Sequence, residues 1–410
     1  MKRLLFIFSF FFLFVLRGNT QEVEILTLED CLRIGIDNNL SLEGKRKLEG
    51  KRKEIQKSKY GVSENRSKLL PQINAIAGYN NNFDPPVSVT DGSSYGVPYN
   101  ITKTLQHSAN AGLEMQMPLF NQTLYTSMSI AKVMEEISRL SYGKAREDVI
   151  LQISKMYYLG QVTAEQIMLI KANIIRLEEL RDITQAFFDN GMSMEVDLKR
   201  VNINLENLKV QYDNAQAMMK QQLNMLKYIM DYPAEKEIAL TPVNTDSITT
   251  VALTGLSENI YELQLSQSQV QLAERQKKII TNGYIPSLSL TGSWRYAAYT
   301  DKGYHWFHSG PSNQWFRSYG VGLTLRIPIF DGLDKTYKIK KAMIDIENKR
   351  LAWEDARKNL QTQYLNAVND LMNNQRNFKK QKDNYLLAED VYAVTSDRYR
   401  EGIASMPEWL

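Results

Sequence analysis

The first half of the chain contains two stretches in which apolar and polar side chains alternate. In residues 107–117 the apolar side chains fall on odd positions from Ala109 to Met117, and the polar ones fall on even positions. Residues 72–83 alternate in the same way, and their polar side carries mostly amides and glycine. A period of two is typical of a strand with one apolar and one polar face. The pattern therefore predicts strands at 72–83 and 107–117.

A long helical pattern follows the second strand almost immediately. Pro118 ends the alternation, and residues 122–190 then contain no proline while apolar residues recur every three or four positions. This predicts one helix over 121–190, which at 1.5 Å per residue would be about 100 Å long. Gly191 suits a turn after this helix, and a second helix with a coiled-coil seam is predicted at 195–230. The two helices are expected to form an antiparallel hairpin.

The regions around the first strand have clear start and break signals. Residues 27–67 are predicted to form a helix, because Thr27 and Asp30 have the spacing of a capping box at its start. Residues 84–104 are rich in Pro, Gly, Ser and Asn. They are predicted to form a loop between the two strands.

The same order of elements recurs in the second half of the chain. The pattern predicts a helix at 256–283, strands at 287–298 and 315–327, and a long helix at 333–401. Three landmark pairs are offset by 215, 210 and 211 residues: Pro71 with Pro286, Pro118 with Pro328, and Gly191 with Gly402. We therefore predict two repeats, 21–232 and 256–410, joined by an irregular linker at 233–255.

Composition excludes several classes of protein. The chain has 410 residues, a net charge of +4 and a mean hydropathy of −0.38. Beyond the N-terminus it has no apolar run of 18 residues, which excludes a helical membrane protein. The net charge is too small to indicate a nucleic-acid partner, and the basic cluster at 45–53 is interleaved with glutamates, as on a solvated helix face. Cys31 is the single cysteine, which excludes a disulfide, and we expect it to be a small buried helix residue.

The N-terminal residues predict export. Lys2 and Arg3 precede an apolar run from Leu4 to Leu16. Residues 1–20 therefore have the form of a secretory signal peptide. The mature chain is expected to lie outside the cytoplasm.

The strand pattern alone also fits a sandwich protein, and three further features favour a membrane barrel. Each strand has about ten residues, the length that crosses an outer membrane when tilted. The long helices could not be covered by a sandwich. Aromatic residues gather near the strand ends, as an aromatic girdle requires: Tyr79, Phe83, Tyr95, Tyr99, Trp294, Tyr296, Tyr299, Tyr304, Trp306, Phe307, Trp315 and Phe316.

Four strands are too few to close a barrel. A bilayer does not tolerate unpaired edge groups, so several chains must share one barrel. Two chains would give about eight strands with a lumen filled by side chains, whereas three would give about twelve and leave room for water. The amides, hydroxyls and glycines on the polar faces of the strands favour the barrel of three chains, which leaves room for water.

Several short motifs, taken in order, resemble those of the TolC-like outer-membrane efflux channels. The resemblance covers essentially the whole mature chain. Two motifs lie in the first helix: Thr27-Leu28-Glu29-Asp30-Cys31-Leu32 and Asn38-Asn39. Two lie just before strands, Leu69-Leu70-Pro71 and Ile285-Pro286, and two lie between a strand and a long helix, Pro118-Leu119-Phe120-Asn121 and Pro328-Ile329-Phe330-Asp331-Gly332. At the two glycine turns, Gly191 and Gly402 are each followed by an acid six residues later.

The resemblance implies an α+β membrane protein that acts as a homotrimer. Each chain would contribute four strands to a twelve-stranded barrel in the outer membrane, continued by long coiled-coil helices that form a periplasmic tunnel. The channel would contact outer-membrane lipid and dock a periplasmic adaptor, through which an inner-membrane pump drives export. It would be a passive conduit of a tripartite efflux or type I secretion system, without a catalytic group or cofactor.

The same resemblance assigns roles to three groups of residues. The periplasmic tips that dock the adaptor would include Phe188, Gly191, Met194, Tyr399, Gly402 and Ser405. The junctions between barrel and helices would be formed by Pro118, Phe120, Asn121, Pro328, Phe330 and Asp331. An acidic gate would be formed by Asp197 and Glu408, which follow the two glycine turns.

The two acids also have a simpler interpretation. A carboxylate in the first turn of a helix is favoured by the helix dipole, so Asp197 and Glu408 could merely start their helices.

The sequence departs from the family pattern at the second tip. In the family, a further acid follows three residues after the position of Glu408, whereas this sequence stops two residues after Glu408. Because no returning helix follows, we expect the sequence to be part of a longer protein, with the apolar seam at Leu360 and Leu371 partly exposed.

Two other classes of function remain open from the residues alone. An enzyme would need a polar constellation, and the three histidines are His107, His305 and His308. A metal site at His305 and His308 would have only Asp301 as a nearby third ligand, so none is expected. An exported coiled-coil scaffold without a pore is the main alternative to the channel.

Overall fold

The computed structural model describes residues 23–40, 47–91, 96, 98–243, 255, 257, 259–301, 315–401 and 403. The chain divides into two compact units. The first comprises residues 1–52, 141–260 and 357–410, and the second comprises 53–140 and 261–356. The expected signal peptide at 1–20 lies outside the described residues. Among the described residues, no helix combines the length and the apolar character needed to cross a membrane.

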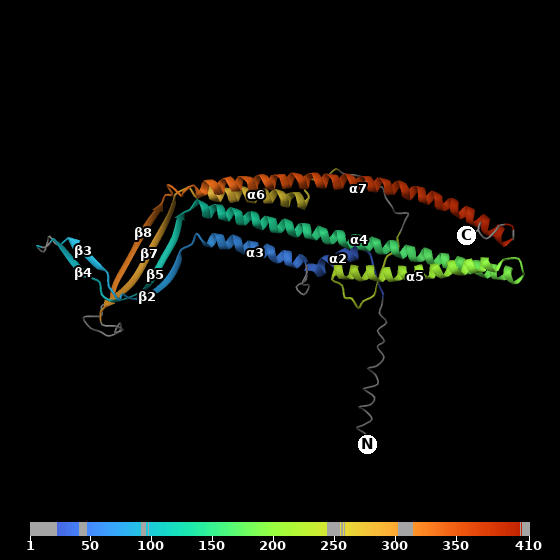
Figure 1. Cartoon of the computed structure of the whole chain (residues 1–410), viewed down its shortest axis with the longest axis horizontal. Helices are drawn as coiled ribbons and strands as arrows, with labels where there is room; N and C mark the ends of the chain where they lie inside the picture. Colours follow the sequence, from blue (N-terminus) through green and yellow to red (C-terminus); the bar gives the residue numbers. More distant parts are fainter. Residues whose placement is uncertain are drawn as a thin grey trace, which may run out of the picture. The chain divides into compact units, whose positions relative to one another are not determined.

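The second unit contains an antiparallel sheet of four strands (Figure 1). The strands are β2 (Gln72–Asn81), β5 (His107–Phe120), β7 (Ser287–Thr300) and β8 (Trp315–Arg326), paired in the order β2-β5-β7-β8. The predicted strands at 72–83, 107–117, 287–298 and 315–327 differ from these only at their ends. β5 and β7, which lie far apart in the sequence, are neighbours in the middle of the sheet. The strands β2 and β8 form its edges.

Two predictions about loops and strand ends were wrong. Residues 84–104 are not simply a loop, because β3 (Val87–Asp91) and β4 (Tyr99–Lys103) form an antiparallel hairpin there. Its β-branched residues, among them Val89 opposite Ile101, outweigh the flanking turn residues. Strand β5 also continues through Pro118 to Phe120, because a register shift at this point accommodates the residue that cannot donate a hydrogen bond.

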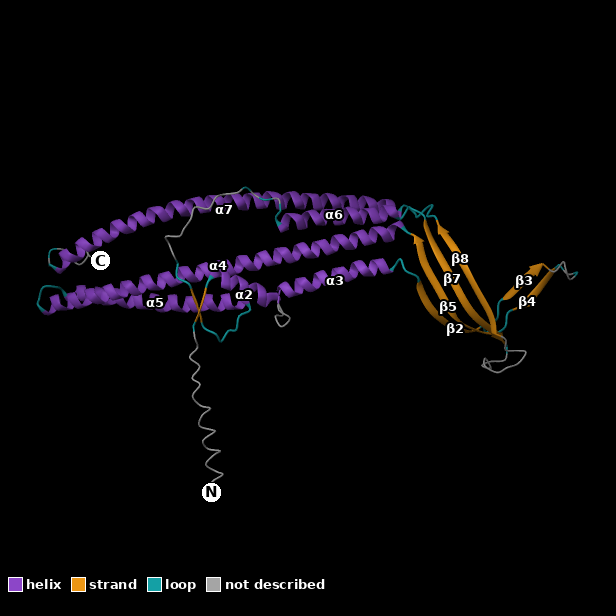
Figure 2. Cartoon of the chain, turned by 180° about the vertical axis from the view of Figure 1, so that it is seen from behind, coloured by secondary structure: helices purple, strands orange, loops and turns teal. Residues whose placement is uncertain are grey.

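Helices of the second unit pack near one end of the strands (Figure 2). They are most of α3 (Lys47–Ser67), α6 (Tyr261–Asn282) and the first parts of α4 (Gln122–Asp189) and α7 (Asp334–Arg400). The hydroxyls of Ser58 on α3 and Ser138 on α4 lie 2.7 Å apart. The amide of Asn282 at the end of α6 donates a hydrogen bond to the hydroxyl of Thr126 on α4, and both side chains are buried.

The first unit is built around a core that joins helices to a small parallel sheet. β1 (Glu24–Leu26) pairs with β6 (Ile238–Leu240), and α2 (Leu28–Leu40) follows β1. The buried core residues come from these elements, α3, α4 and α5 (Glu195–Met230): Leu26, Cys31, Leu48, Ala145, Val149, Ile153, Tyr157, Leu226, Met230 and Ile238. Cys31 is fully buried as expected, and burial raises the pKa of its thiol to about 11.

The sequence did not predict the small sheet. The linker at 233–255 was expected to be irregular, but it contains β6, whose three residues are too few to show a period. The helix expected over 27–67 is described as α2 and α3, and residues 41–46 between them lie outside the described residues. The predicted capping box is confirmed: the Asp30 amide donates to the Thr27 hydroxyl over 3.1 Å, and the Thr27 amide donates to the Asp30 carboxylate over 3.3 Å.

The expected antiparallel pairing of the helices at 121–190 and 195–230 is confirmed in the first unit. α4 and α5 lie side by side in both views (Figures 1 and 2), and their buried apolar residues form a second core: Leu177, Leu180, Val201 and Leu205, joined by Tyr399 of α7. The helices expected at 256–283 and 333–401 are the slightly shorter α6 and α7.

Candidate functional site

The four-stranded sheet has one strongly polar face. Residues that pair across the strands point to the same side of a sheet, so the pairing register defines rows of side chains. Three successive rows on this face run across all four strands: Gln72, Gln116, Thr291 and Gly322; Asn74, Glu114, Ser293 and Gly320; Ile76, Gly112, Arg295 and Ser318. Amides, hydroxyls and glycines dominate these rows, as the alternation predicted. Such a face is suited to contact with water rather than to packing in a core.

The opposite face is apolar and exposed. Its rows include Ala75, Leu113, Trp294 and Tyr319, and the neighbouring row ends at Val321. On β8 the exposed fractions reach 77% for Tyr319 and 80% for Val321. Large exposed apolar surfaces of this kind mark a face that meets another apolar medium or partner.

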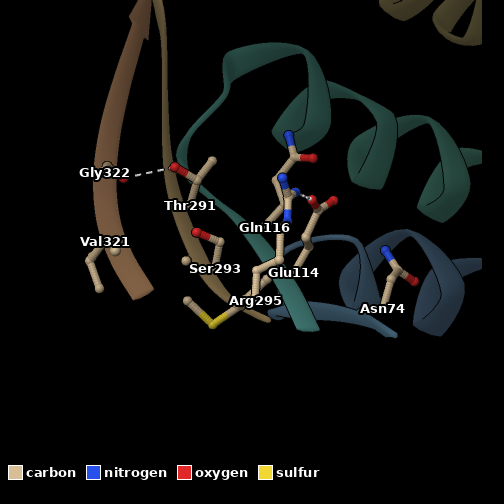
Figure 3. Close-up of a pocket in the computed structure, with 11 residues that line it drawn as sticks. Asn74, Glu114, Gln116, Thr291, Ser293, Arg295, Val321 and Gly322 are labelled. Atoms are coloured by element: carbon tan, nitrogen blue, oxygen red, sulfur yellow. Dashed lines mark hydrogen bonds and ion pairs between the residues drawn. The ribbon is translucent and has the colours of Figure 1, made fainter. Parts of the chain in front are cut away.

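A hollow of about 510 Å³ lies along the polar rows (Figure 3). Asn74, Gln116, Thr291 and Ser293 are among the residues that line it. Within it, the guanidinium Nη2 of Arg295 on β7 donates a hydrogen bond to Oε1 of Glu114 on β5, and the two side chains turn toward each other. About 43% of the Arg295 side chain and 46% of the Glu114 side chain are exposed. The sequence patterns did not predict this ion pair, because it depends on the register between strands about 180 residues apart.

Part of the predicted aromatic clusters falls on the apolar face. The hydroxyl of Tyr79 lies 2.8 Å from Nδ1 of His107, and their rings stack. Trp294 and Tyr296 contact each other edge to face, with ring centroids 5.4 Å apart. Other members of the predicted girdle, Tyr95, Tyr304, Trp306 and Phe307, lie outside the described residues.

The first predicted junction, at Pro118, Phe120 and Asn121, joins β5 to α4. Pro118 still pairs with β7 beside the register shift, and the Phe120 ring contacts Tyr125 at a centroid distance of 6.4 Å. Asn121 caps the helix, because its Oδ1 accepts hydrogen bonds from the backbone amides of Thr123 and Leu124 over 3.1 and 3.3 Å. A single side chain therefore sets where α4 begins.

The second predicted junction, at Pro328, Phe330 and Asp331, joins β8 to α7. Phe330 is 81% exposed. The Asp331 carboxylate accepts hydrogen bonds from the backbone amide of Lys335 over 3.2 Å and from its ammonium over 2.9 Å. These bonds, led by the one from the Lys335 side chain, lower the pKa of Asp331. The same ammonium lies 5.0 Å from the centroid of the Tyr284 ring.

The first predicted tip lies in the first unit, between α4 and α5. Gly191 has a φ of +72°, and the amides of Gly191 and Met192 bond back to Phe188 and Phe187 over 2.9 and 2.8 Å. This is the hydrogen-bond pattern of a Schellman turn, which favours glycine. The side chains around the turn are apolar and exposed: Phe188 is 37% exposed, Met192 69% and Met194 72%.

Asp197 lies in the first turn of α5, three residues before Arg200. Its carboxylate is 3.8 Å from the guanidinium of Arg200, and 23% of its side chain is exposed. Glu195, in the same turn, pairs with Lys199 over 2.8 Å, and this hydrogen bond lowers the pKa of Glu195. The gate and the helix-start interpretation of Asp197 both stay predictions.

Of the residues predicted to form the second tip, the structure describes only Tyr399. Tyr399 is 6% exposed, its hydroxyl lies 3.2 Å from that of buried Thr184, and its ring contacts Phe187 at 5.9 Å. It therefore packs within its own chain rather than presenting its ring for docking. Gly402, Ser405 and Glu408 lie outside the described residues.

One motif residue has a contact that the sequence patterns did not predict. The side-chain amide of Asn38 donates to the backbone carbonyls of Met230 and Asp231 over 3.3 and 3.1 Å. These carbonyls lie at the end of α5, where backbone acceptors lack partners within the helix. Asn38 thus ties α2 to the end of α5.

The described residues contain no group of three or more His, Cys, Asp or Glu side chains that could hold a metal ion. His305 and His308, the candidates considered from the sequence, fall outside the described residues.

Comparison with known proteins identifies the family. The model of the outer membrane efflux protein family matches residues 39–230 and 253–410, which is most of the chain. The chain belongs to the outer membrane efflux protein family. It is accordingly a TolC-like protein of the outer membrane with a large periplasmic part, as predicted. This is a family of transport conduits and not of enzymes.

The similarity to individual family members is distant but extensive. The chain is 21% identical to the outer membrane protein TolC of Vibrio cholerae over 76% of its own length and 66% of that protein's length, just under two thirds. It is 23% identical to the probable efflux pump outer membrane protein TtgC of Pseudomonas putida, over 78% and 67% of the two chains. The structure of the outer-membrane channel OprN superposes with a TM-score of 0.75 at 15% identity, over 93% of this chain and 83% of that one. The fold is that of the outer-membrane channels.

Proposed function

We propose that three copies of this chain form an outer-membrane channel that serves as a passive conduit for export. The observation that carries the proposal is the sheet itself. It has a polar face, an exposed apolar face and two edge strands, β2 and β8, without a further neighbour among the described strands.

Closure requires other copies of the chain. Inside a bilayer the edge N–H and C=O groups of β2 and β8 must be paired, because no water is available to bind them. The four strands alternate in direction, so β8 of one copy can pair antiparallel with β2 of the next without changing the pattern. A ring built in this way has its apolar face toward lipid and its polar face toward the lumen.

The polar face favours three copies over two. Eight strands leave an interior just wide enough to be filled by side chains, whereas about twelve leave space for water. Gly320 and Gly322 have no side chains to fill a narrow interior, and the rest of their rows are amides, hydroxyls and the carboxylate of Glu114. The wider lumen of a twelve-stranded barrel suits these small and polar side chains, which would contact water.

The tip supports a role for partner proteins. The apolar side chains of Phe188, Met192 and Met194 stand exposed around the Gly191 turn, a surface suited to the hairpin of a periplasmic adaptor. An inner-membrane pump would act through that adaptor, in a tripartite efflux or type I secretion system. The description of the Pseudomonas relative as a probable efflux pump protein favours efflux over type I secretion. Asp197 would contribute to an acidic gate at the tips.

A planar-bilayer recording combined with the oligomeric state tests the channel. We expect the purified protein to migrate as a trimer in detergent and to give stepwise currents in a bilayer. A trimer that never conducts under any applied voltage would contradict the channel and favour an exported coiled-coil scaffold. A stable dimer that conducts would contradict the twelve-stranded barrel but not the conduit.

A further inference from the structure

We infer that the Glu114–Arg295 ion pair influences the charge preference of the barrel lumen by keeping the middle of the lumen close to neutral. The inference rests on the proposed function, since it places the polar face of the sheet in a water-filled lumen. It concerns a pair on the barrel strands in the second unit and is independent of the acids at the tip.

The pair supplies the charged residues of its two rows on the polar face. Glu114 lies directly beside Asn74 on one side and Ser293 on the other, while Arg295 lies directly beside Gly112 and Ser318. The ion pair runs diagonally between these two rows. Figure 3 shows the two side chains turned toward each other on this face. In a trimer, three such pairs would face one another across the lumen at one height.

The charge balance at this level depends on the pair. The described parts of the four barrel strands carry four charged residues that are acidic or are Lys or Arg: Glu114, Arg295, Arg317 and Arg326. Arg317 lies in a row of the apolar face, paired with Tyr296. Arg326 also lies on the polar face, but at the end of β8 next to α7, where it pairs with Ser287 at the start of β7 and not with the level of the ion pair. Removing one member of the pair would therefore leave a ring of three like charges in the middle of the lumen.

Such a ring would act on passing ions. A lumen lined by one sign of charge concentrates ions of the opposite sign, which is how rings of acidic or basic side chains select ions in channels. Each pair is about half exposed and thus adds little to stability, so its variants should still fold. The two single variants should change selectivity in opposite directions.

The test compares reversal potentials of full-length channels under a KCl gradient at low ionic strength, where the Debye length is about 10 to 30 Å. Glu114→Gln leaves three arginines, and we expect the K⁺/Cl⁻ permeability ratio to fall by about twofold or more. Arg295→Gln leaves three glutamates, and the ratio should rise by a similar factor. The double variant should return to the wild-type ratio.

Arg317→Gln is the matched control, because it removes the same charge from the same sheet on the opposite face. It should leave the permeability ratio unchanged. Shifts in the same direction for both single variants, or none in either, would overturn the inference while wild-type currents still support the channel. Absence of wild-type current would instead contradict the proposed function. A shift in the Arg317→Gln variant as large as in Arg295→Gln would also overturn the inference, since the effect would then not depend on the polar face.

Discussion

Single residues determine where α4 and α7 begin and where α4 ends. Asn121 and Asp331 accept backbone hydrogen bonds at the starts of α4 and α7, and Gly191 closes the end of α4 with a positive φ. The side chains of Asn121 and Asp331, and the backbone amides at the Gly191 turn, satisfy helix-end groups that would otherwise lack a partner. Gly191 was predicted from the chemistry of helix ends, whereas Asn121 and Asp331 were named as junction residues by the family resemblance, and the sequence patterns did not predict their capping bonds.

The turn at Gly191 should depend on glycine. Gly191→Ala places a Cβ at a φ of +72°, and we expect it to destabilise the protein by about 1 kcal/mol. Gly50→Ala is the control, because Gly50 lies in α3 and a Cβ there would contact nothing within 4 Å. It should stabilise the helix by about 0.5–1 kcal/mol. Thermal unfolding followed by circular dichroism should show melting shifts of opposite sign, and equal shifts would contradict the assignment.

The cap at Asp331 should make the start of α7 sensitive to acid. Because hydrogen bonds from Lys335 lower the pKa of Asp331, its stabilising effect is present above the usual carboxyl pKa and is lost as the pH falls through the lowered value. We expect Asp331→Asn to lower the melting temperature at pH 7 and to match the wild type in strong acid.

Asp345→Asn serves as the comparison for this cap. Asp345 is an exposed carboxylate within the same helix. Its substitution should change the melting temperature little at either pH. A loss at pH 7 equal to that of Asp331→Asn would show that charge alone, and not the cap, is responsible.

At the scale of elements, the sheet depends on close contacts that no local pattern contains. Strands β5 and β7 come from opposite halves of the chain, and their backbones approach closely at Gly112. The alternation predicted both strands and their faces, because each face has to suit its own surroundings. It could not predict which strands are neighbours, since pairing depends on contacts across the whole chain.

Gly112 should be intolerant of a side chain. A Cβ there would lie 2.4 Å from the carbonyl oxygen of Trp294 and 2.8 Å from the Cα of Arg295, both backbone atoms of β7. We expect Gly112→Ala to cost about 1–3 kcal/mol, because the two strands must move apart. Gly320→Ala, on β8 with nothing within 4 Å of the added atom, should cost less than about 0.5 kcal/mol. Thermal unfolding of both variants in detergent measures the difference, and similar losses would contradict the close approach.

At the scale of the whole molecule, the proposed trimer would bring three copies of the tip together. In that assembly Asp197 would contribute three carboxylates to one opening, whereas in a single chain it lies beside Arg200 at the start of α5. A charge that merely favours a helix start acts within its own chain, but a gate acts on ions that pass between chains.

Substitution of Asp197 distinguishes these roles. If it belongs to the gate, Asp197→Asn should lower the preference of the open channel for cations by about twofold. Glu195→Gln is the control, since it removes the same charge from the same helical turn. Reversal potentials of the two variants should differ, and the same small change in both would assign Asp197 to the helix start.

The sequence by itself determined the features that depend on residues close together in the chain. The period of the strands, the long helices without proline, the capping box at Thr27 and the glycine turn follow from interactions within a few residues, so they could be predicted. The expected extent of the loop at 84–104 was wrong because its hairpin is stabilised by pairing between two short strands.

Only the tertiary structure decided the contacts between distant segments. The Glu114–Arg295 pair, the buried bond between Asn282 and Thr126 and the burial of Tyr399 each join residues more than 150 positions apart. The β1–β6 pair likewise joins strands too short to carry a pattern. The physical reason is that these contacts depend on the register and packing of elements, which local residue preferences do not specify.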